Sequence, residues 1–215
     1  MKTTPHSLLI KVCGMRLSHN IRAVEALGVD LMGFIFYPRS PRYVGPRPDY
    51  LPTHCLRVGV FVNAPAGEVE ERAADFGLDL IQLHGNESPD YCRRLIDAGL
   101  QLIKVFSLRA EGDAAATEMY EGLCRYFLFD TPTAQYGGSG TAFDWSLLDA
   151  YRGDTPFLLS GGIGPGSAES ISRLAHPRLA GIDLNSRFET EPGLKDVDRL
   201  RDFITKVKRR TANSR

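Results

Sequence analysis

Residues 57–84 read RVGVFVNAPAGEVEERAADFGLDLIQLH, and this stretch predicts one complete strand–helix–strand unit. Its two ends, 57–62 and 80–83, are apolar runs with little polar alternation, which is typical of strands buried on both faces of a parallel sheet. Between them Val69, Ala73 and Phe76 recur at helical spacing. Two parallel strands joined through a helix require a crossover, and such crossovers are right-handed in nearly all proteins.

The same alternation recurs along the whole chain. Helical spacing follows Ser18 and Ser88, each a candidate N-cap, whereas the segments 47–51 and 114–123 are weaker and the first is expected to be little more than a turn. The predicted strands are 8–13, 31–36, 57–62, 80–83, 102–106, 126–130, 156–160 and 180–184. Eight such units favour closure into a (β/α)8 TIM barrel over an open doubly wound sheet.

The bulk composition fits one soluble domain. The chain has 215 residues, 43% of them hydrophobic and 24% charged, and shows no linker, so we predict a single domain over 1–215 with frayed tails at 1–7 and 209–215. Lys plus Arg number 26 and Asp plus Glu also number 26, which gives no electrostatic reason to expect nucleic acid or a membrane as a partner. We expect a monomer, with a homodimer as the alternative.

Targeting and metal signals are missing from the sequence. No apolar run approaches the roughly 20 residues that span a bilayer, and residues 1–7 lack a leader pattern, so we expect a cytoplasmic protein. The four cysteines have no CxxC or metal-ligand spacing, and no HxE- or DxD-type pattern occurs at the strand ends. We therefore expect no disulfide, no metal site and no cofactor.

Polar residues gather at the ends of the predicted strands. In this fold the active site lies at the carboxyl ends of the strands, so residues scattered in sequence would meet on one face. The residues concerned are Lys11, Cys13, Arg39, Asn63, Gln82, His84, Asp130, Ser160, Asp183, Asn185 and Ser186.

Three late loops suit a phosphate group. Gly137-Gly138-Ser139-Gly140 and Gly161-Gly162 offer backbone N–H groups without a Cβ in the way, and Asn185-Ser186 follows the last strand. Loops after the last strands form the recurring phosphate site of this fold. A single glycine cluster often marks only a turn, but two at neighbouring strand ends predict a phosphate ligand.

Cys13 and Asp130 are the acid–base candidates. Taken alone, Cys13 is more simply a buried core thiol, but Lys11 faces the same side of the strand and could favour a thiolate. Asp130 ends an otherwise apolar run, where it could donate a proton or merely cap or pair. His84 could be a base, but we prefer a pocket-shaping role because no nucleophile or Asp partner lies near it in the pattern.

The ordered set of motifs resembles the phosphoribosylanthranilate isomerase family from Leu9 onward. Lys11-Val12-Cys13-Gly14-Met15 is similar to the motif that opens the family, and the later motifs follow in family order. They are GFIFYPRSPR at 33–42, VGVFVN at 58–63, QLHGNE at 82–87, GGSGTAFDW at 137–145, LSGGI at 159–163, GIDLNS at 181–186 and PGLKD at 192–196. The chain departs from the family pattern at three positions. Asn86 stands where Asp is commoner, Ser139 stands where Thr is usual, and Arg187 stands where the family often has glycine.

The resemblance implies a cofactor-free isomerisation in tryptophan biosynthesis. N-(5-phosphoribosyl)anthranilate would become 1-(2-carboxyphenylamino)-1-deoxyribulose 5-phosphate, with Asp130 as general acid on the ring oxygen and Cys13 as general base at C2. By the same resemblance Arg39 would hold the anthranilate carboxylate. Further substrate contacts are expected from Lys11, Asn63, Gln82 and His84, and phosphate contacts from Gly138, Ser139, Gly140, Gly161, Gly162, Asp183, Asn185 and Ser186.

Two other interpretations remain at this point. Another phosphate-binding barrel, such as a pentose-phosphate epimerase, would call for paired carboxylates and metal-binding histidines at the strand ends. A non-catalytic barrel that keeps only the scaffold would be expected to lose Cys13, Asp130 or the phosphate glycines, all of which are present.

Overall fold

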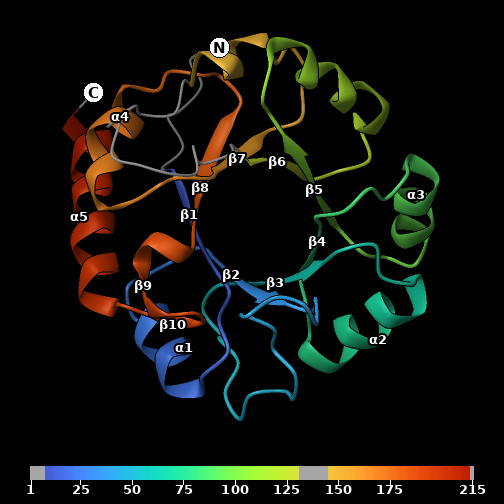
Figure 1. The fold of residues 1–215 in the computed structure, drawn as a ribbon, viewed down its shortest axis with the longest axis horizontal. Coiled ribbons are helices and arrows are strands. Elements are labelled where there is room, and N and C mark those ends of the chain that lie inside the picture. Colours follow the sequence, from blue (N-terminus) through green and yellow to red (C-terminus); the bar gives the residue numbers. More distant parts are fainter. Residues whose placement is uncertain (1–7, 131–144, 214–215) are drawn as a thin grey trace.

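Eight parallel strands close into a barrel in the order of the chain (Figure 1). The structure is a computed structural model that describes residues 8–130 and 145–213. The barrel strands are β1 (Leu9–Cys13), β2 (Leu31–Ile35), β3 (Leu56–Phe61), β4 (Leu80–Leu83), β5 (Leu102–Ser107), β6 (Tyr126–Asp130), β7 (Phe157–Ser160) and β8 (Leu179–Leu184). The predicted fold is confirmed, and each predicted strand lies within about one residue of the observed one.

The helices form an outer ring around the strands (Figure 1). The α-helices are α1 (Ser18–Glu25), α2 (Ala66–Phe76), α3 (Pro89–Asp97), α4 (Ala168–Arg173) and α5 (Val197–Asn213), and the 3-10 helices are η1 (Glu111–Tyr120), η2 (Trp145–Ala150), η3 (Pro165–Ser167) and η4 (Ser186–Phe188). No helix joins β2 to β3, as the weak pattern at 47–51 predicted. Two short strands, β9 (Glu189–Glu191) and β10 (Leu194–Lys195), form an antiparallel hairpin after β8.

The predicted helix starts had mixed outcomes. Ser88 caps α3 as expected, because its Oγ accepts from the N–H of Tyr91 at 3.2 Å. Ser18 does not cap α1: the cap position is Leu17, and the Ser18 hydroxyl instead accepts from the N–H of Tyr50 at 3.3 Å. At the other end of the chain α5 continues to Asn213, through most of the segment that was expected to fray.

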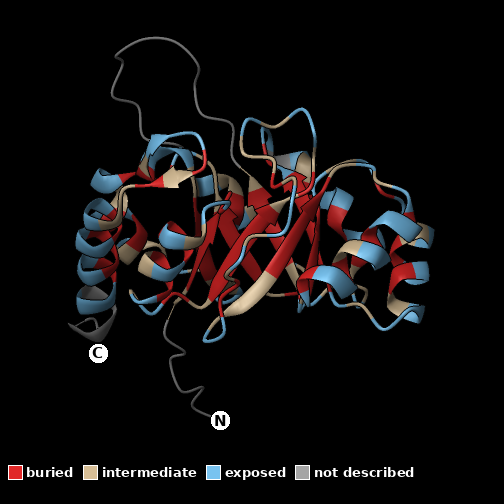
Figure 2. Cartoon of the chain, turned by 90° about the horizontal axis from the view of Figure 1, so that it is seen from below, coloured by how far each residue is buried: buried red, intermediate tan, exposed pale blue. Residues whose placement is uncertain are grey.

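Two apolar layers hold the barrel together. A small cluster fills the barrel interior and consists of Leu31, Val58, Leu80, Ile103, Val105, Leu128 and Leu158. A larger cluster lies between the strands and the helices and includes Phe34, Phe76 and Phe203. Figure 2 shows the result, with buried positions in the strands and on the inner faces of the helices. The filled interior leaves the carboxyl ends of the strands as the place for a site.

Candidate active site

A cavity of about 310 Å³ lies at the carboxyl ends of the strands, within the size range of small-molecule sites. It is lined by Cys13, Ile35, Val60, Gln82, His84, Asp130, Ser160, Gly161, Gly162, Ile163, Asp183, Asn185, Ser186 and Arg187. Residues of β1, β4, β6, β7 and β8 thus meet here. The expected convergence of strand-end residues is confirmed for this set.

Cys13 is the last residue of β1 and is buried, yet its side chain reaches the cavity. Its register partner on β2 is Gly33. A Cβ at position 33 would lie 2.7 Å from the Cys13 Sγ, closer than real Cβ contacts allow. The thiol therefore occupies space that only a glycine on the neighbouring strand leaves open.

A buried ion pair lies beside the thiol. Lys11 Nζ lies 2.9 Å from Asp183 Oδ1, and the two residues are register partners on β1 and β8. Burial lowers the pKa of Lys11, but attraction to Asp183 and then to Cys13 outweighs burial and raises that pKa overall. Lys11 is therefore a permanent buried cation.

Opposing influences act on the Cys13 thiol. Burial is the largest and raises its pKa, the positive charge of Lys11 lowers it, Asp183 raises it and Lys195 lowers it. The balance is a raised pKa, so these surroundings do not produce the low-pKa thiolate that a nearby Lys11 suggested. A thiolate formed here is a stronger base than an ordinary cysteine, although fewer molecules carry it.

Asp130 has a partner that the sequence pattern did not reveal. His84 Nε2 lies 3.8 Å from Asp130 Oδ2, so a histidine after β4 faces the carboxyl that ends β6. Gln82 Nε2 lies 3.1 Å from His84 Nδ1. An amide nitrogen can only donate, so Nδ1 accepts and the ring proton sits on Nε2, toward Asp130. No Asp lies near His84 in the sequence pattern, and barrel closure brings Asp130 to it from another strand.

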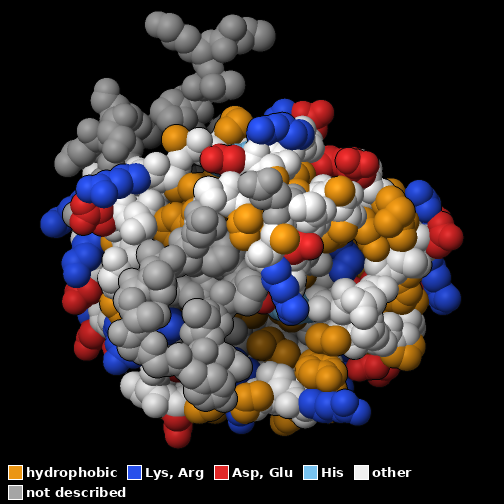
Figure 3. Space-filling model, turned by 45° about the horizontal axis from the view of Figure 1, so that its top comes forward, with side chains coloured by type: hydrophobic (Ala, Val, Ile, Leu, Met, Phe, Trp, Pro, Cys, Tyr) orange, Lys and Arg blue, Asp and Glu red, His pale blue; other side chains and the backbone are white. Residues whose placement is uncertain are grey.

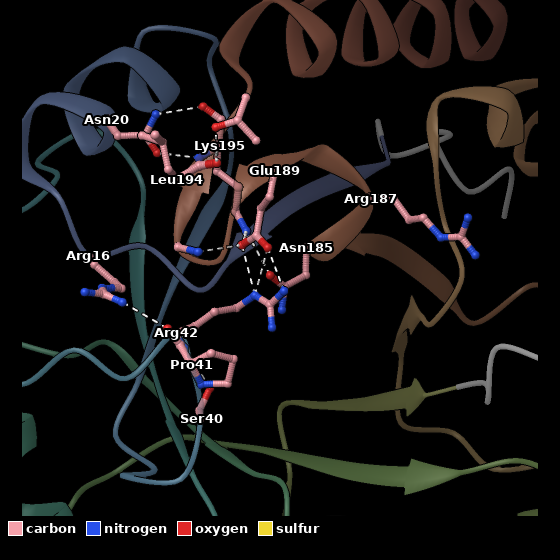
Figure 4. A network of polar contacts seen from close by, with 12 residues as sticks. Arg16, Asn20, Ser40, Pro41, Arg42, Asn185, Arg187, Glu189, Leu194 and Lys195 are labelled. Atoms are coloured by element: carbon pink, nitrogen blue, oxygen red, sulfur yellow. Dashed lines mark hydrogen bonds and ion pairs between the residues drawn. The ribbon is translucent and has the colours of Figure 1, made fainter. Parts of the chain in front are cut away.

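The loop after β8 is fixed by a polar network (Figure 4). Lys195 Nζ donates to Asn185 Oδ1 at 2.8 Å and to Glu189 Oε1 at 2.6 Å, while Arg42 donates to both Glu189 oxygens at 2.6–3.0 Å. Because Lys195 takes the amide oxygen of Asn185, the remaining polar group of that side chain is an N–H donor, which suits an anion. Burial raises the pKa of Glu189, but its hydrogen bonds to Arg42 and Lys195 prevail and lower that pKa overall.

Comparison with known proteins places the chain in one family. Residues 10–206 match the family described as N-(5'phosphoribosyl)anthranilate (PRA) isomerase. The chain belongs to the PRA isomerase family. It is 55% identical to the N-(5'-phosphoribosyl)anthranilate isomerase of Phocaeicola vulgatus over 203 residues, which are 94% of this chain and 99% of that relative.

Solved structures agree with the family match. A phosphoribosyl anthranilate isomerase in complex with reduced 1-(o-carboxyphenylamino)-1-deoxyribulose 5-phosphate gives a TM-score of 0.78 at 31% identity, covering 94% of this chain and 98% of the other. Monomers of the dimeric isomerase from Thermotoga maritima give a TM-score of 0.76 at 29% identity over the same shares of the chains. The resemblance is confirmed: the chain is an aldose–ketose isomerase of tryptophan biosynthesis, and neither a pentose-phosphate epimerase nor a non-catalytic barrel.

Some residues assigned by resemblance to the isomerases lie away from the cavity. Arg39 is exposed in the loop after β2 and is not among the lining residues. Asn63 adopts a left-handed backbone (φ 51°), and its side chain accepts from the N–H of Asn86 at 2.7 Å. Lys11 lies buried behind the lining. Gly138, Ser139 and Gly140 lie outside the described residues.

Charge is mixed on the face of the isomerase that Figure 3 shows, where Lys and Arg alternate with Asp and Glu around the rim. Within the described ranges, no group of three or more His, Cys, Asp or Glu side chains is arranged to hold a metal ion. No helix in that part of the chain is long and apolar enough to cross a membrane.

Proposed function

We propose that the chain converts N-(5-phosphoribosyl)anthranilate to 1-(2-carboxyphenylamino)-1-deoxyribulose 5-phosphate, with Asp130 as general acid and Cys13 as general base. The observation that carries this assignment is that both side chains line one cavity, from β6 and β1. Within that cavity they are a carboxyl and a thiol with separate partners, His84 and Lys11. An acid and a base at different walls of one pocket are what a proton-shifting isomerisation needs.

The reaction is written in three steps. Asp130 gives a proton to the furanose ring oxygen, the bond from that oxygen to C1 breaks, and the nitrogen lone pair forms the C=N bond of a Schiff base. The Cys13 thiolate then removes the proton from C2, the C–H electrons become the C1=C2 bond, and the C=N π electrons return to the nitrogen, which gives an enolamine. Tautomerisation moves the hydroxyl proton of C2 to C1 and leaves the ketone. The acid and base exchange protons with solvent to reset.

The raised pKa of Cys13 fits the second step. A proton next to a protonated Schiff base is acidic, and a base with a higher pKa removes it with more driving force. The fixed positive charge of Lys11 compensates the negative thiolate when it forms. Lys11 does not line the cavity, so we assign it to Cys13 rather than to the substrate. Asp183, expected to bind phosphate, is assigned to Lys11, since a carboxylate engaged at 2.9 Å is a poor anion ligand.

Further contacts position the substrate. Gly161 and Gly162 both have left-handed backbones (φ 84° and 65°), a conformation that glycine adopts freely. They line the cavity together with Asn185 and Ser186. We assign this part of the cavity to the phosphate group of the substrate. Gln82 Oε1 is buried, has no hydrogen-bond partner among the described residues and is assigned to a substrate hydroxyl. Arg39 and Asn63, which do not line the cavity, stay predictions, as do Gly138, Ser139 and Gly140.

The test is turnover of freshly made phosphoribosylanthranilate, followed as loss of its fluorescence with EDTA present. Cys13→Ser and Asp130→Asn should each lower kcat by roughly 100-fold or more, as expected for acid–base groups. Cys124→Ser, at a half-buried cysteine outside the cavity, is the matched control and should keep its activity. Full activity in Cys13→Ser would overturn the assigned base, and an inactive wild type would overturn the reaction itself.

His84 is proposed to position Asp130 and not to transfer a proton to the substrate. His84→Ala should therefore lower kcat about 10-fold with little change in KM. If KM rose while kcat stayed the same, His84 would be a binding residue instead.

We propose a monomer acting in the cytoplasm. Among the described residues only Leu17 and Met119 are large exposed hydrophobic side chains, which gives no apolar patch for a stable interface. The Thermotoga maritima relative is called dimeric, so the homodimer is the alternative. Light scattering after size exclusion decides between about 24 and about 48 kDa, on a chain mass of 23.8 kDa, and cell fractionation tests the location.

A further inference from the structure

We propose that Arg187 is an additional phosphate-binding residue of this active site. The inference rests on the proposed function, because it assigns the phosphate of that substrate to a side chain outside the set expected from resemblance. Arg187 follows Asn185 and Ser186 directly after β8. It lines the same cavity as Gly161, Gly162 and Ser186.

The local fold holds Arg187 at the cavity wall. It is the middle residue of η4, directly before Phe188, whose ring is fully buried and packs against Phe203 with centroids 4.9 Å apart. Phe188 thus anchors η4 in the core. In Figure 4 the Arg187 side chain extends away from the network of Arg42 and Glu189, toward the segment that follows β7.

The stem of Arg187 rests on a glycine of that segment. A Cβ built at Gly164 would lie 3.4 Å from the Cβ, 3.6 Å from the Cγ and 3.7 Å from the Cδ of Arg187, which is ordinary van der Waals contact. The aliphatic part of the side chain therefore lies beside Gly164, two residues after Gly162. Packing of the stem reduces the rotamer freedom that a long side chain would lose on binding a ligand.

The charges of the cavity call for such a group. The lining contains the carboxylates Asp130 and Asp183, and Arg187 is the only Lys or Arg among the lining residues of the described chain. The nearby buried cations Lys11 and Lys195 are already paired, with Asp183 and Glu189. Arg187 would therefore supply the positive charge for a substrate that carries both a phosphate and a carboxylate.

The Arg187 guanidinium is available for this role. Within 8–130 and 145–213, no carboxylate lies within ion-pair distance of it, whereas Arg42, Arg173, Arg178, Arg199 and Arg201 each have one. A planar guanidinium beside backbone N–H groups is well matched to phosphate oxygens, with which it forms charge-assisted bidentate hydrogen bonds.

The experiment compares Arg187→Ala and Arg187→Lys with the wild type and with Arg173→Ala, a control on exposed α4 that breaks only a surface pair with Glu169. The measurements are kcat and KM for phosphoribosylanthranilate and the inhibition constants of two probes, inorganic phosphate and anthranilate. Arg187→Ala should raise KM and the phosphate inhibition constant each by roughly 10- to 100-fold, with kcat within about threefold. Arg187→Lys should recover part of this loss, and the anthranilate constant should not move.

Three results would overturn the proposal: an unchanged phosphate constant, a change in the anthranilate constant alone, or an equal loss in Arg173→Ala. Arg187 is exposed, so the alanine variant should fold, and thermal unfolding checks this. If the wild type did not turn over the substrate, calorimetric titration with inorganic phosphate would still compare wild type and Arg187→Ala. Failure of the proposed function and failure of the Arg187 assignment are thereby distinguished.

Discussion

Lys11 and Asp183 form a buried ion pair across the seam where β1 meets β8, with Nζ 2.9 Å from Oδ1. The pair lies beside the thiol of Cys13, and Lys11 favours its ionised form while Asp183 disfavours it. One contact therefore joins the closure of the barrel to the electrostatics of the proposed base.

Removing one partner of this pair should be costly. Lys11→Met leaves the Asp183 carboxylate buried and unpaired, and we expect a loss of about 3–5 kcal/mol in the free energy of unfolding. The double variant Lys11→Met with Asp183→Leu should recover most of the stability but not the activity. Urea unfolding measures the stability, and kcat measures the activity. A double variant as unstable as Lys11→Met would contradict the pairing argument.

The pH dependence of kcat/KM should report the thiol. Burial raises the pKa of Cys13, so activity should climb with pH on the alkaline side as the thiolate forms. Lys11 lowers the pKa of Cys13 more than Asp183 raises it, so the loss of both charges in the double variant with Asp183→Leu should move this limb to higher pH. Asp183→Asn alone removes an unfavourable charge and should move the limb to lower pH. If the alkaline limb of the kcat/KM profile did not move in Asp183→Asn, the charge of Asp183 would not act on the pKa of Cys13.

Gly33 should resist even the smallest side chain. In Gly33→Ala the new Cβ would lie 2.7 Å from the Cys13 Sγ, so the thiol must shift, and we expect a loss of about 1–3 kcal/mol with a fall in kcat of roughly 10-fold or more. Gly67→Ala is the control, since nothing lies within 4 Å of its Cβ, and there alanine should stabilise α2 by about 0.5–1 kcal/mol. Chemical denaturation and kinetics on both variants check this, and a neutral Gly33→Ala would show that the space is not needed.

Glu189 should contribute to stability only above acidic pH. The pKa of Glu189 is lower in the folded chain than in the unfolded one, so its contribution is full above about pH 5 and is lost as the pH falls through the folded value. Glu189→Gln leaves Lys195 and Arg42 without a charged partner and should cost on the order of 2–3 kcal/mol at pH 7. The stability of the Glu189→Gln variant should then fall less steeply below pH 5 than that of the wild type. Glu169→Gln, at an exposed pair, should change stability by about 0.5 kcal/mol or less.

The barrel could be predicted from the sequence because its signals are local. Runs such as 80–83 are apolar without alternation, and they coincide with the observed strands. The hairpin of β9 and β10 was not predicted, because strands of three and two residues leave no periodicity. The position of Cys13 at a strand end was predictable, but its raised pKa was not, because that depends on burial and on Asp183, which comes from a distant part of the chain.

The contact between His84 and Asp130 shows the same limit. Each residue was recognised at a strand end, yet their proximity depends on how far β4 and β6 curve around the barrel. Arg187 was noticed only as a departure from the family. Its place beside Gly164 emerges from the packing of η4 against the segment after β7.

The seam between β1 and β8 also sets an order of events during synthesis. Lys11 and Asp183 are 172 positions apart, so a ribosome makes Cys13 long before its buried surroundings exist. Until β8 emerges, the first strand has an open edge, and the nascent thiol stays exposed to water and to oxidants. Chains stalled after β6 should therefore react with thiol reagents at Cys13 far faster than the finished enzyme, and the loss of that reactivity would mark the moment at which the ring closes.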